Sequence, residues 1–317
     1  MHRKRLNGSV GNLLLAFAAL FFSVLSSGCA ASHPTVVKPS GAPPPAETAS
    51  KQDLIARFNQ QANSITSLNA SVTMTLTAGS AYTGVIKQYH EINGFILAEK
   101  PASVRLIGQA PVVGTNIFDM VSDGETFHIF IPSQHKFIVG SANLTRQSAK
   151  PIENMRPQHL TSAIFWNPVP DRTPVLIEQA NDETARYYVL TVVRIAGEPA
   201  TPAGAAASWE LAERIWFDRA DLHLARIETY ESGGQLASDV SFSGWNMFGD
   251  VNYPRQILLS RPDSDYKLLI GIKKAIFNVT VTPDRFVLAQ PPGTELVNAT
   301  EGSPRSRPRE SEPNGEK

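Results

Sequence analysis

The stretch SVTMTLT at residues 71–77 sets the fold class of this 317-residue chain. Its apolar residues, Val72, Met74 and Leu76, alternate with serine and threonine. This period of two is that of a β-strand with one apolar and one hydroxyl-bearing face. Similar stretches follow, separated by turn signals such as Asp123-Gly124. Because no long helical pattern separates neighbouring stretches, the sequence predicts an antiparallel meander.

The other predicted strands form one group on each side of a polar middle region. The first group comprises Tyr82–Ala98 (as one long or two short strands), Ser103–Ile107, Thr115–Ser122, Glu125–Ile131 and Lys136–Val139. The second group comprises Val175–Glu178, Tyr187–Arg194, Ser208–Phe217, Leu224–Glu231, Ala237–Trp245, Gln256–Ser260, Tyr266–Phe277 and a brief strand at Phe286–Leu288.

Two helices accompany these strands. Apolar residues recur at helical spacing over Lys51–Ile65, and Ser50 with Asp53 forms a shorter relative of a capping box at its start. The second helix is predicted at Pro157–Trp166, with proline in its first position. The apolar side of the first helix is typical of packing on a sheet.

The predicted fold is therefore mainly β with a few helices: a large, curved antiparallel sheet that forms an incomplete barrel. A sheet of about a dozen strands curls rather than stays flat. Its concave face can enclose a cavity for an apolar ligand, or the two helices can fill the space completely, and periodicity does not decide between these alternatives. The residues expected to line a cavity are Val72, Met74, Ile96, Leu106, Phe118, Met120, Phe127, Ile129, Ile215, Phe217, Ile227, Phe242, Leu268 and Ile270.

The N-terminus has the pattern of a secretory signal. A basic segment, His2-Arg3-Lys4-Arg5, precedes an apolar run too short to span a bilayer, and small residues follow. The segment Leu25–Cys29 (LSSGC) resembles the lipobox of bacterial lipoproteins, which implies cleavage before Cys29 and lipidation of its sulfur. The alternative is an ordinary signal peptide with an incidental cysteine. Acyl chains on Cys29 would anchor the protein firmly to a membrane.

Composition excludes several classes of function. Cys29 is the only cysteine, so the exported domain has no disulfide. Lys plus Arg and Asp plus Glu both total 29, and no basic block stands out, which argues against nucleic-acid binding. The sequence contains neither a nucleophile elbow nor a phosphate-binding glycine loop, and its histidines lack metal-type spacing. We therefore expect no catalysis, no metal and no cofactor. Asp218 and Asp221 fit a hairpin turn better than a catalytic pair.

The chain divides into four predicted parts. Residues 1–28 are the signal peptide, and residues 29–50 are the lipidated cysteine followed by a tether rich in proline, alanine and serine. Residues 51–297 form the folded domain. Residues 298–317 are charged, rich in proline and free of aromatic residues, so we expect a disordered tail.

Several motifs of the folded domain resemble the LolA and LolB family of lipoprotein carriers. They are Leu97–Pro101 (LAEKP), Val104-Arg105-Leu106, Pro111, Val121–Gly124 (VSDG) with Phe127, and Phe286–Gly293 (FVLAQPPG). The similarity covers about residues 53–297. It implies an incomplete barrel lidded by helices, with a hydrophobic cavity that holds the acyl chains of lipoproteins in transit.

The resemblance assigns roles to two positions. Lys100 stands where LolA carriers place an arginine that holds the lid closed. Lysine lacks the multi-donor fork of arginine, so the resemblance does not decide whether Lys100 controls a lid in this way. Val112 and Val113 stand where LolB has a protruding loop with an exposed leucine used in cargo delivery. Valines are unusual in a turn. The two side chains either form a tip that contacts membrane or cargo, or fold back onto the core.

Three hypotheses for function follow. The first is a lipid-anchored carrier or receptor that passes lipoproteins or lipids to the outer membrane and faces the periplasm. The second is a lipoprotein that binds another apolar ligand or a protein partner, and the third is a structural lipoprotein with a vestigial cavity. Ala30, the residue after Cys29, resembles the sorting signal for the outer membrane. We expect a monomer whose partners are acyl chains, the membrane and a periplasmic carrier protein.

Overall fold

The computed structural model describes residues 45–79, 86–142, 156–182, 185–196 and 208–299 of the chain. These residues belong to one compact unit. The predicted signal peptide, Cys29 and most of the predicted tether lie outside the described residues. Within the described ranges, no helix combines the length and the apolar character that a membrane crossing requires.

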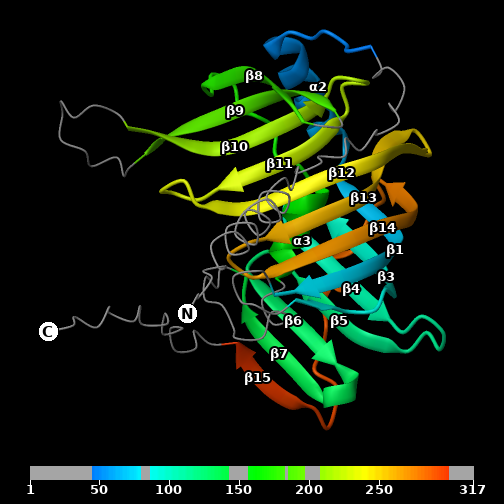
Figure 1. The fold of residues 1–317 in the computed structure, drawn as a ribbon. Helices are drawn as coiled ribbons and strands as arrows, with labels where there is room; N and C mark the ends of the chain where they lie inside the picture. The colour runs from blue at the N-terminus through cyan, green and yellow to red at the C-terminus, as the bar shows by residue number, and fades with distance from the viewer. Residues whose placement is uncertain (1–44, 80–85, 143–155, 183–184, 197–207, 300–317) are drawn as a thin grey trace, which may run out of the picture. The chain divides into compact units, whose positions relative to one another are not determined.

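Fifteen strands of the described residues form one curved sheet (Figure 1). The strands are β1 (Ser67–Ala78), β2 (Lys87–Gln88), β3 (Ile92–Glu99), β4 (Ser103–Gln109), β5 (Asn116–Ser122), β6 (Thr126–Ile131), β7 (Lys136–Ser141), β8 (Val175–Asn181), β9 (Arg186–Ala196), β10 (Ser208–Asp218), β11 (Leu224–Tyr230), β12 (Leu236–Phe248), β13 (Val251–Arg261), β14 (Tyr266–Phe277) and β15 (Glu295–Ala299). Their order is β15-β7-β6-β5-β4-β3-β1-β14-β13-β12-β11-β10-β9-β8, with β2 paired to β1. All neighbours are antiparallel except β15 and β7. The predicted fold class is confirmed.

The central pair, β1 and β14, joins the two predicted groups of strands. The alternation of the opening stretch is confirmed, since Val72 and Met74 are buried on the inner face while their threonine neighbours are partly exposed. Leu76 and Leu268 lie opposite each other in the register of these two strands. The region predicted as one long or two short strands contains β2 and β3, although its first residues lie outside the described ranges.

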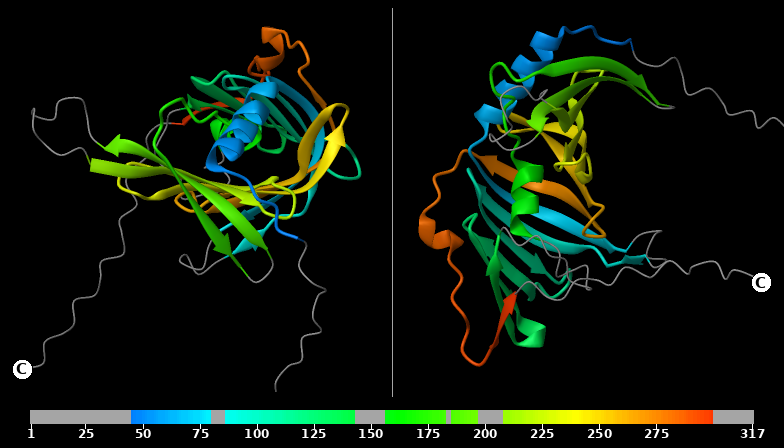
Figure 2. Two further views of the ribbon diagram at one scale, coloured as in Figure 1. Left: turned by 90° about the horizontal axis from the view of Figure 1, so that it is seen from above. Right: turned by 90° about the vertical axis from the view of Figure 1, so that its left-hand side faces the viewer.

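Two helices lie on the concave side of the sheet: α2 (Lys51–Ser64) and α3 (Pro157–Ile164) (Figure 2). Helix α2 begins with a reciprocal capping box, in which the Asp53 amide donates to Ser50 Oγ at 3.2 Å and the Ser50 amide donates to Asp53 Oδ2 at 3.0 Å. The buried sides of both helices join one core cluster with the inner face of the sheet; their members are Leu54, Phe58, Ala62, Leu160, Ala163 and Ile164.

The C-terminal part differs from the prediction. The brief strand predicted at Phe286–Leu288 is wrong: a 3-10 helix, η3 (Pro283–Phe286), occupies its start, and the chain then crosses the outer face of the sheet. There Arg105 Nη1 donates to the Arg285 carbonyl at 3.2 Å. This segment lies over strands rather than beside one, so it has no ladder to join. Strand β15 follows, and it extends into the region that was predicted to be a tail.

Candidate functional site

An apolar pocket of about 280 Å³ opens at one end of the concave face. Its floor comes from β1 and β14 and its walls from the start of β5 and from residues 89–92; the lining residues are Met74, Leu76, Tyr89, His90, Ile92, Ile117, Phe118 and Leu268. Apart from the imidazole and the phenol, every lining side chain is aliphatic, aromatic or a thioether. The volume lies near the lower end of the roughly 300–1,000 Å³ typical of ligand pockets. The arrangement can therefore hold a slender apolar chain.

Two glycines give the pocket its shape. A Cβ at Gly94 in β3 would lie 2.3 Å from Met74 Cε, and a Cβ at Gly108 in β4 would lie 2.4 Å from the Phe118 ring. Both glycines therefore provide the space in which Met74 and Phe118 lie back against the sheet. A glycine inside a strand often marks such a close approach. Gly94 and Gly108 are therefore a sequence signal for this pocket that apolar alternation alone does not contain.

The predicted lining residues separate into two groups. Met74, Phe118 and Leu268 line the pocket. Eleven others lie away from its walls, in or against the packed interior of the domain: Val72, Ile96, Leu106, Met120, Phe127, Ile129, Ile215, Phe217, Ile227, Phe242 and Ile270. Helices α2 and α3 fill most of the concave face, and the pocket occupies the end that they leave uncovered.

The turn between β4 and β5 carries two exposed valines beside the pocket. Val112 is 95% exposed and Val113 is 71% exposed. The turn is closed by hydrogen bonds between Ala110 and Thr115 and between Gly114 and Ala110, each 3.0 Å long. Ile117, four residues after Val113, is itself a partly exposed wall of the pocket. Exposed apolar side chains therefore lie both at the tip of the turn and at the pocket wall that follows it in the chain.

Lys100 connects the ends of the two helices. Its Nζ donates to the carbonyl of Ala62, near the end of α2, at 2.5 Å. The same Nζ lies 5.7 Å from the centre of the Phe165 ring, one residue beyond α3. Burial lowers the pKa of this ammonium group from its ordinary value. Lys100 follows the last residue of β3 and Ile92, a pocket residue, begins that strand, so the two lie roughly 25 Å apart along the strand at about 3.3 Å per residue.

A second hollow, of about 360 Å³, lies on the outer face between the sheet and η3. Phe95 and Ile107 contribute apolar surface, while Arg105 and Arg285 contribute charge. Arg105 is held by two hydrogen bonds to the Asp119 carboxylate, at 3.1 and 2.7 Å. This hollow is larger than the inner pocket, but cationic side chains form part of its lining.

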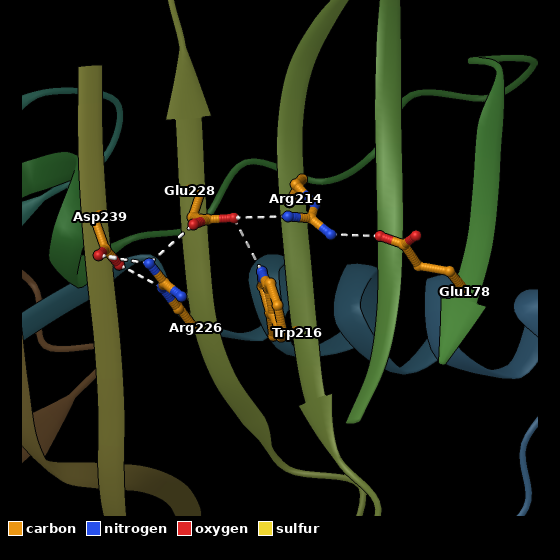
Figure 3. A network of polar contacts seen from close by, with 6 residues as sticks. All are labelled: Glu178, Arg214, Trp216, Arg226, Glu228 and Asp239. Atoms are coloured by element: carbon orange, nitrogen blue, oxygen red, sulfur yellow. Dashed lines mark hydrogen bonds and ion pairs between the residues drawn. The ribbon is translucent and has the colours of Figure 1, made fainter. Parts of the chain in front are cut away.

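The outer face of β8, β10, β11 and β12 carries a network of charged side chains that the sequence analysis did not predict (Figure 3). Glu228 is its centre, with a side chain only 8% exposed. It accepts a hydrogen bond from Trp216 Nε1 at 3.1 Å and pairs with Arg226 at 2.8 Å. Arg226 also binds Asp239 through two bonds of 2.7 Å.

Arg214 extends the network to the sheet edge. It lies 3.7 Å from Glu228 and pairs with Glu178, whose side chain reaches across β9 from β8 (Figure 3). The guanidinium groups of Arg214 and Arg226 both lie near the Trp216 ring, 4.9 and 5.5 Å from its centre. Every charge in this network has an opposite partner, so its evident role is to join four strands.

Other candidate groups have local roles. Asp218 Oδ1 accepts from the Ala220 amide at 2.8 Å, and Asp221 Oδ1 accepts from the His223 amide at 2.9 Å, as is usual for aspartates in turns. Among the described residues, no cluster of three or more histidine, cysteine or acidic side chains could hold a metal ion.

Comparison with known proteins gives similarities of structure. No protein-family model and no curated protein sequence matches the chain. A LolA superfamily protein from Nitrosomonas europaea is 11% identical, with 76% of this chain and 99% of that chain covered and a TM-score of 0.45. A DUF1329 family protein from Desulfovibrio piger is 13% identical, with 74% and 95% covered and a TM-score of 0.46.

A third similar structure is a domain from Vibrio parahaemolyticus that is described as a candidate outer membrane lipoprotein-sorting protein. It is 11% identical, with 73% of this chain and 94% of that chain covered and a TM-score of 0.42. At these identities the likeness concerns the fold alone. The resemblance to LolA-type proteins predicted from the sequence is confirmed in that sense: LolA superfamily and lipoprotein-sorting domains are among the structures to which this chain is similar.

Proposed function

We propose that this protein is a lipid-anchored carrier or receptor of the cell envelope that holds an acyl chain of a lipid or lipoprotein in its inner pocket. The observation that carries the proposal is the apolar pocket at the uncovered end of the concave face. An acyl chain offers only apolar surface, and burial of that surface is worth about 0.8 kcal/mol per methylene. The lining residues supply the matching surface without a charged carboxylate or guanidinium group.

The predicted anchor supports an envelope location. Under this proposal Cys29 carries the lipid, residues 30–50 form the tether, and the folded domain faces the periplasm from the outer membrane. A carrier that delivers acyl chains needs access to the bilayer or to a partner carrier protein. The exposed Val112 and Val113, beside the pocket, provide an apolar tip of the kind that such an encounter requires.

Lys100 has a defined part in this proposal. It holds the end of α2 near the end of α3, the two helices that cover most of the concave face. A single ammonium group can release one carbonyl more readily than a guanidinium fork releases several acceptors. We therefore assign Lys100 as a releasable contact between the ends of the two helices.

Lipid analysis of the protein from its own membranes tests the proposal. The full-length protein is extracted in a mild detergent, its tether is cleaved, and the released domain is examined by native mass spectrometry and by organic extraction. Co-purifying acyl chains or lipoprotein support the carrier. A different apolar molecule supports the second hypothesis, a lipoprotein that binds another ligand, and an empty domain contradicts both.

The control is a variant with a filled pocket. Leu76→Trp places a large ring on the pocket floor, and Leu269→Trp places the same ring on the outer face of the neighbouring strand. The carrier proposal predicts that Leu76→Trp loses the bound material and that Leu269→Trp keeps it. Equal amounts of bound lipid in both variants would show that the lipid is held by the detergent micelle or by another surface of the protein, and not by the pocket.

A further inference from the structure

A buried polar cluster adjoins the apolar pocket on the same face of β14. Tyr266 lies two residues before the pocket residue Leu268, about 7 Å along the strand. Its hydroxyl is 2.8 Å from Nδ1 of His159, in the first turn of α3. Tyr266 is 2% exposed, and His159 is partly buried. Along the inner face of β14, the Tyr266–His159 pair is thus the polar group next to the pocket residue Leu268.

Two arginines flank this pair. Arg261, opposite Tyr266 in the register of β13 and β14, and Arg156, immediately before α3, both act on the pKa of His159 and Tyr266 through their charge. Burial, with these two charges, lowers the pKa of His159 to about 3, so this histidine is neutral at physiological pH. The cluster thus has two guanidinium charges beside a neutral imidazole and a neutral phenol.

Arg261 carries a buried donor, its Nε, that has no hydrogen-bond partner among the described residues. A buried donor without an acceptor is costly, and such atoms in native proteins often mark a place for a water or a ligand. Arg156 is 6% exposed, and its guanidinium lies 5.3 Å from the centre of the Phe127 ring. Guanidinium groups are well suited to bind phosphate and carboxylate oxygens.

We propose that the occupant of the inner pocket is a single-chain amphiphile with an anionic head group, a phosphate or a carboxylate, which Arg261 and Arg156 bind while the chain lies over Leu76 and Leu268. This inference rests on the proposed function, because it assigns the head group of the ligand whose chain fills the pocket. The pocket volume of about 280 Å³ favours one acyl chain over the several chains of a lipoprotein N-terminus.

Competition binding tests the head-group preference. The neutral fluorescent probe N-phenylnaphthylamine is bound to the folded protein and displaced below micellar concentrations by dodecyl phosphate, dodecanoate, dodecanol or dodecyltrimethylammonium. We expect the two anions to displace the probe at concentrations at least tenfold lower than the alcohol, and the cation to be the weakest. A clear lead of the phosphate over the carboxylate assigns the ligand to single-chain phosphate lipids, and equal strength assigns it to fatty acids as well.

Two variants assign the preference to this cluster. Arg261→Gln should reduce the preference for anions by about tenfold while probe binding stays unchanged, and Arg261→Lys should retain part of it. Arg255→Gln removes an exposed arginine of the same strand and serves as the matched control, with no expected change.

The outcomes separate this inference from the proposed function. Failure of the intact protein to bind both the probe and every dodecyl compound contradicts the carrier itself. Probe binding with equal displacement by dodecanol and the anions overturns the head-group inference alone. The same conclusion follows if Arg261→Gln binds the probe and keeps the full preference for anions. Unchanged probe binding in Arg261→Gln also shows that the variant is folded.

Discussion

The inner pocket and the outer charge network lie on opposite faces of one sheet, and they differ in how completely their groups are matched. In the network, each guanidinium lies next to a carboxylate, and Glu228 has three donors around it. In the pocket, apolar side chains of β1, β5 and β14 face a volume that the described residues leave unfilled. A packed protein interior leaves few such voids. From this difference we infer that the network serves stability, and we propose that the pocket serves binding.

Removal of Glu228 should give the largest loss of stability. Glu228→Ala leaves Arg214, Arg226 and Trp216 without their shared acceptor, and breaking a buried charge pair on one side costs about 3 kcal/mol. Urea unfolding measures the change. Glu178→Ala is the matched control, because its side chain is half exposed and should contribute less than about 1 kcal/mol. Equal losses in the two variants would contradict a network centred on Glu228.

His159 should make stability depend on pH. Its folded pKa of about 3 lies below the ordinary value of 6.5, so the unfolded chain binds the proton more readily. The contribution of the neutral His159 to the free energy of unfolding is complete above about pH 6.5 and declines as the pH falls towards 3. The loss between pH 6.5 and 4.5 is about 2 to 3 kcal/mol at 1.36 kcal/mol per pKa unit. If the free energy of unfolding varies with pH in the same way in the wild type and in His159→Gln, the loss of stability at low pH does not come from His159.

Filling the pocket should affect binding more than stability. Leu76→Trp should weaken displacement of N-phenylnaphthylamine by a dodecyl compound at least tenfold, which is about 1.4 kcal/mol. The outer-face variant Leu269→Trp should bind as the wild type does. Comparable unfolding midpoints of the two variants would show that the lost binding reflects occupied space. Full binding by Leu76→Trp would place the site elsewhere.

Loss of the Lys100 contact should have a smaller effect. Lys100→Met keeps most of the aliphatic stem but removes the bond to the Ala62 carbonyl, at an expected cost of about 1 kcal/mol. Hydrogen exchange at the end of α2 should increase, while exchange in the β10–β12 region stays constant. Lys100→Arg, which restores a donor, should reverse the increase. Unchanged hydrogen exchange at the end of α2 in Lys100→Met would show that Lys100 does not hold the two helices together.

A charge at the exposed tip should slow the transfer of ligand to membranes without changing the stability of the fold. Val112 makes no buried contact that a glutamate would break, so Val112→Glu should unfold at the same denaturant concentration as the wild type. Transfer of a fluorescent acyl compound from the protein to vesicles should slow several-fold because a carboxylate resists entry into the bilayer. Ser232→Glu, in the exposed turn between β11 and β12, is the control for added charge. Equal transfer rates would contradict a role of the tip.

Local patterns predict much of this fold. Alternation in β1 correctly assigns Val72 and Met74 to the inner face, and Ser50 with Asp53 correctly predicts the start of α2, because both signals depend on residues close in the sequence. Strand β15 was not predicted, since its parallel pairing with β7 joins residues more than 150 positions apart. The strand expected at Phe286–Leu288 does not form, and its first residue is the last of a 3-10 helix that begins at Pro283.

The candidate site was harder to predict from the sequence, because it too depends on contacts between residues that are distant along the chain. The sequence identifies inward-facing apolar residues, but the extent to which α2 and α3 cover them depends on tertiary packing. Met74 therefore lines the pocket while Val72, two residues earlier, lies in the core. The charge network depends on the register of four strands, which places Arg226 of β11 beside Asp239 of β12. No local pattern specifies such a pairing.

A crystal structure of the protein with a brominated dodecyl chain would show where the chain binds, because anomalous scattering locates the bromine. We expect a bromine peak inside the inner pocket, among Leu76, Phe118 and Leu268. A peak in the outer hollow beside Phe95 and Arg285 with an empty inner pocket would contradict this expectation.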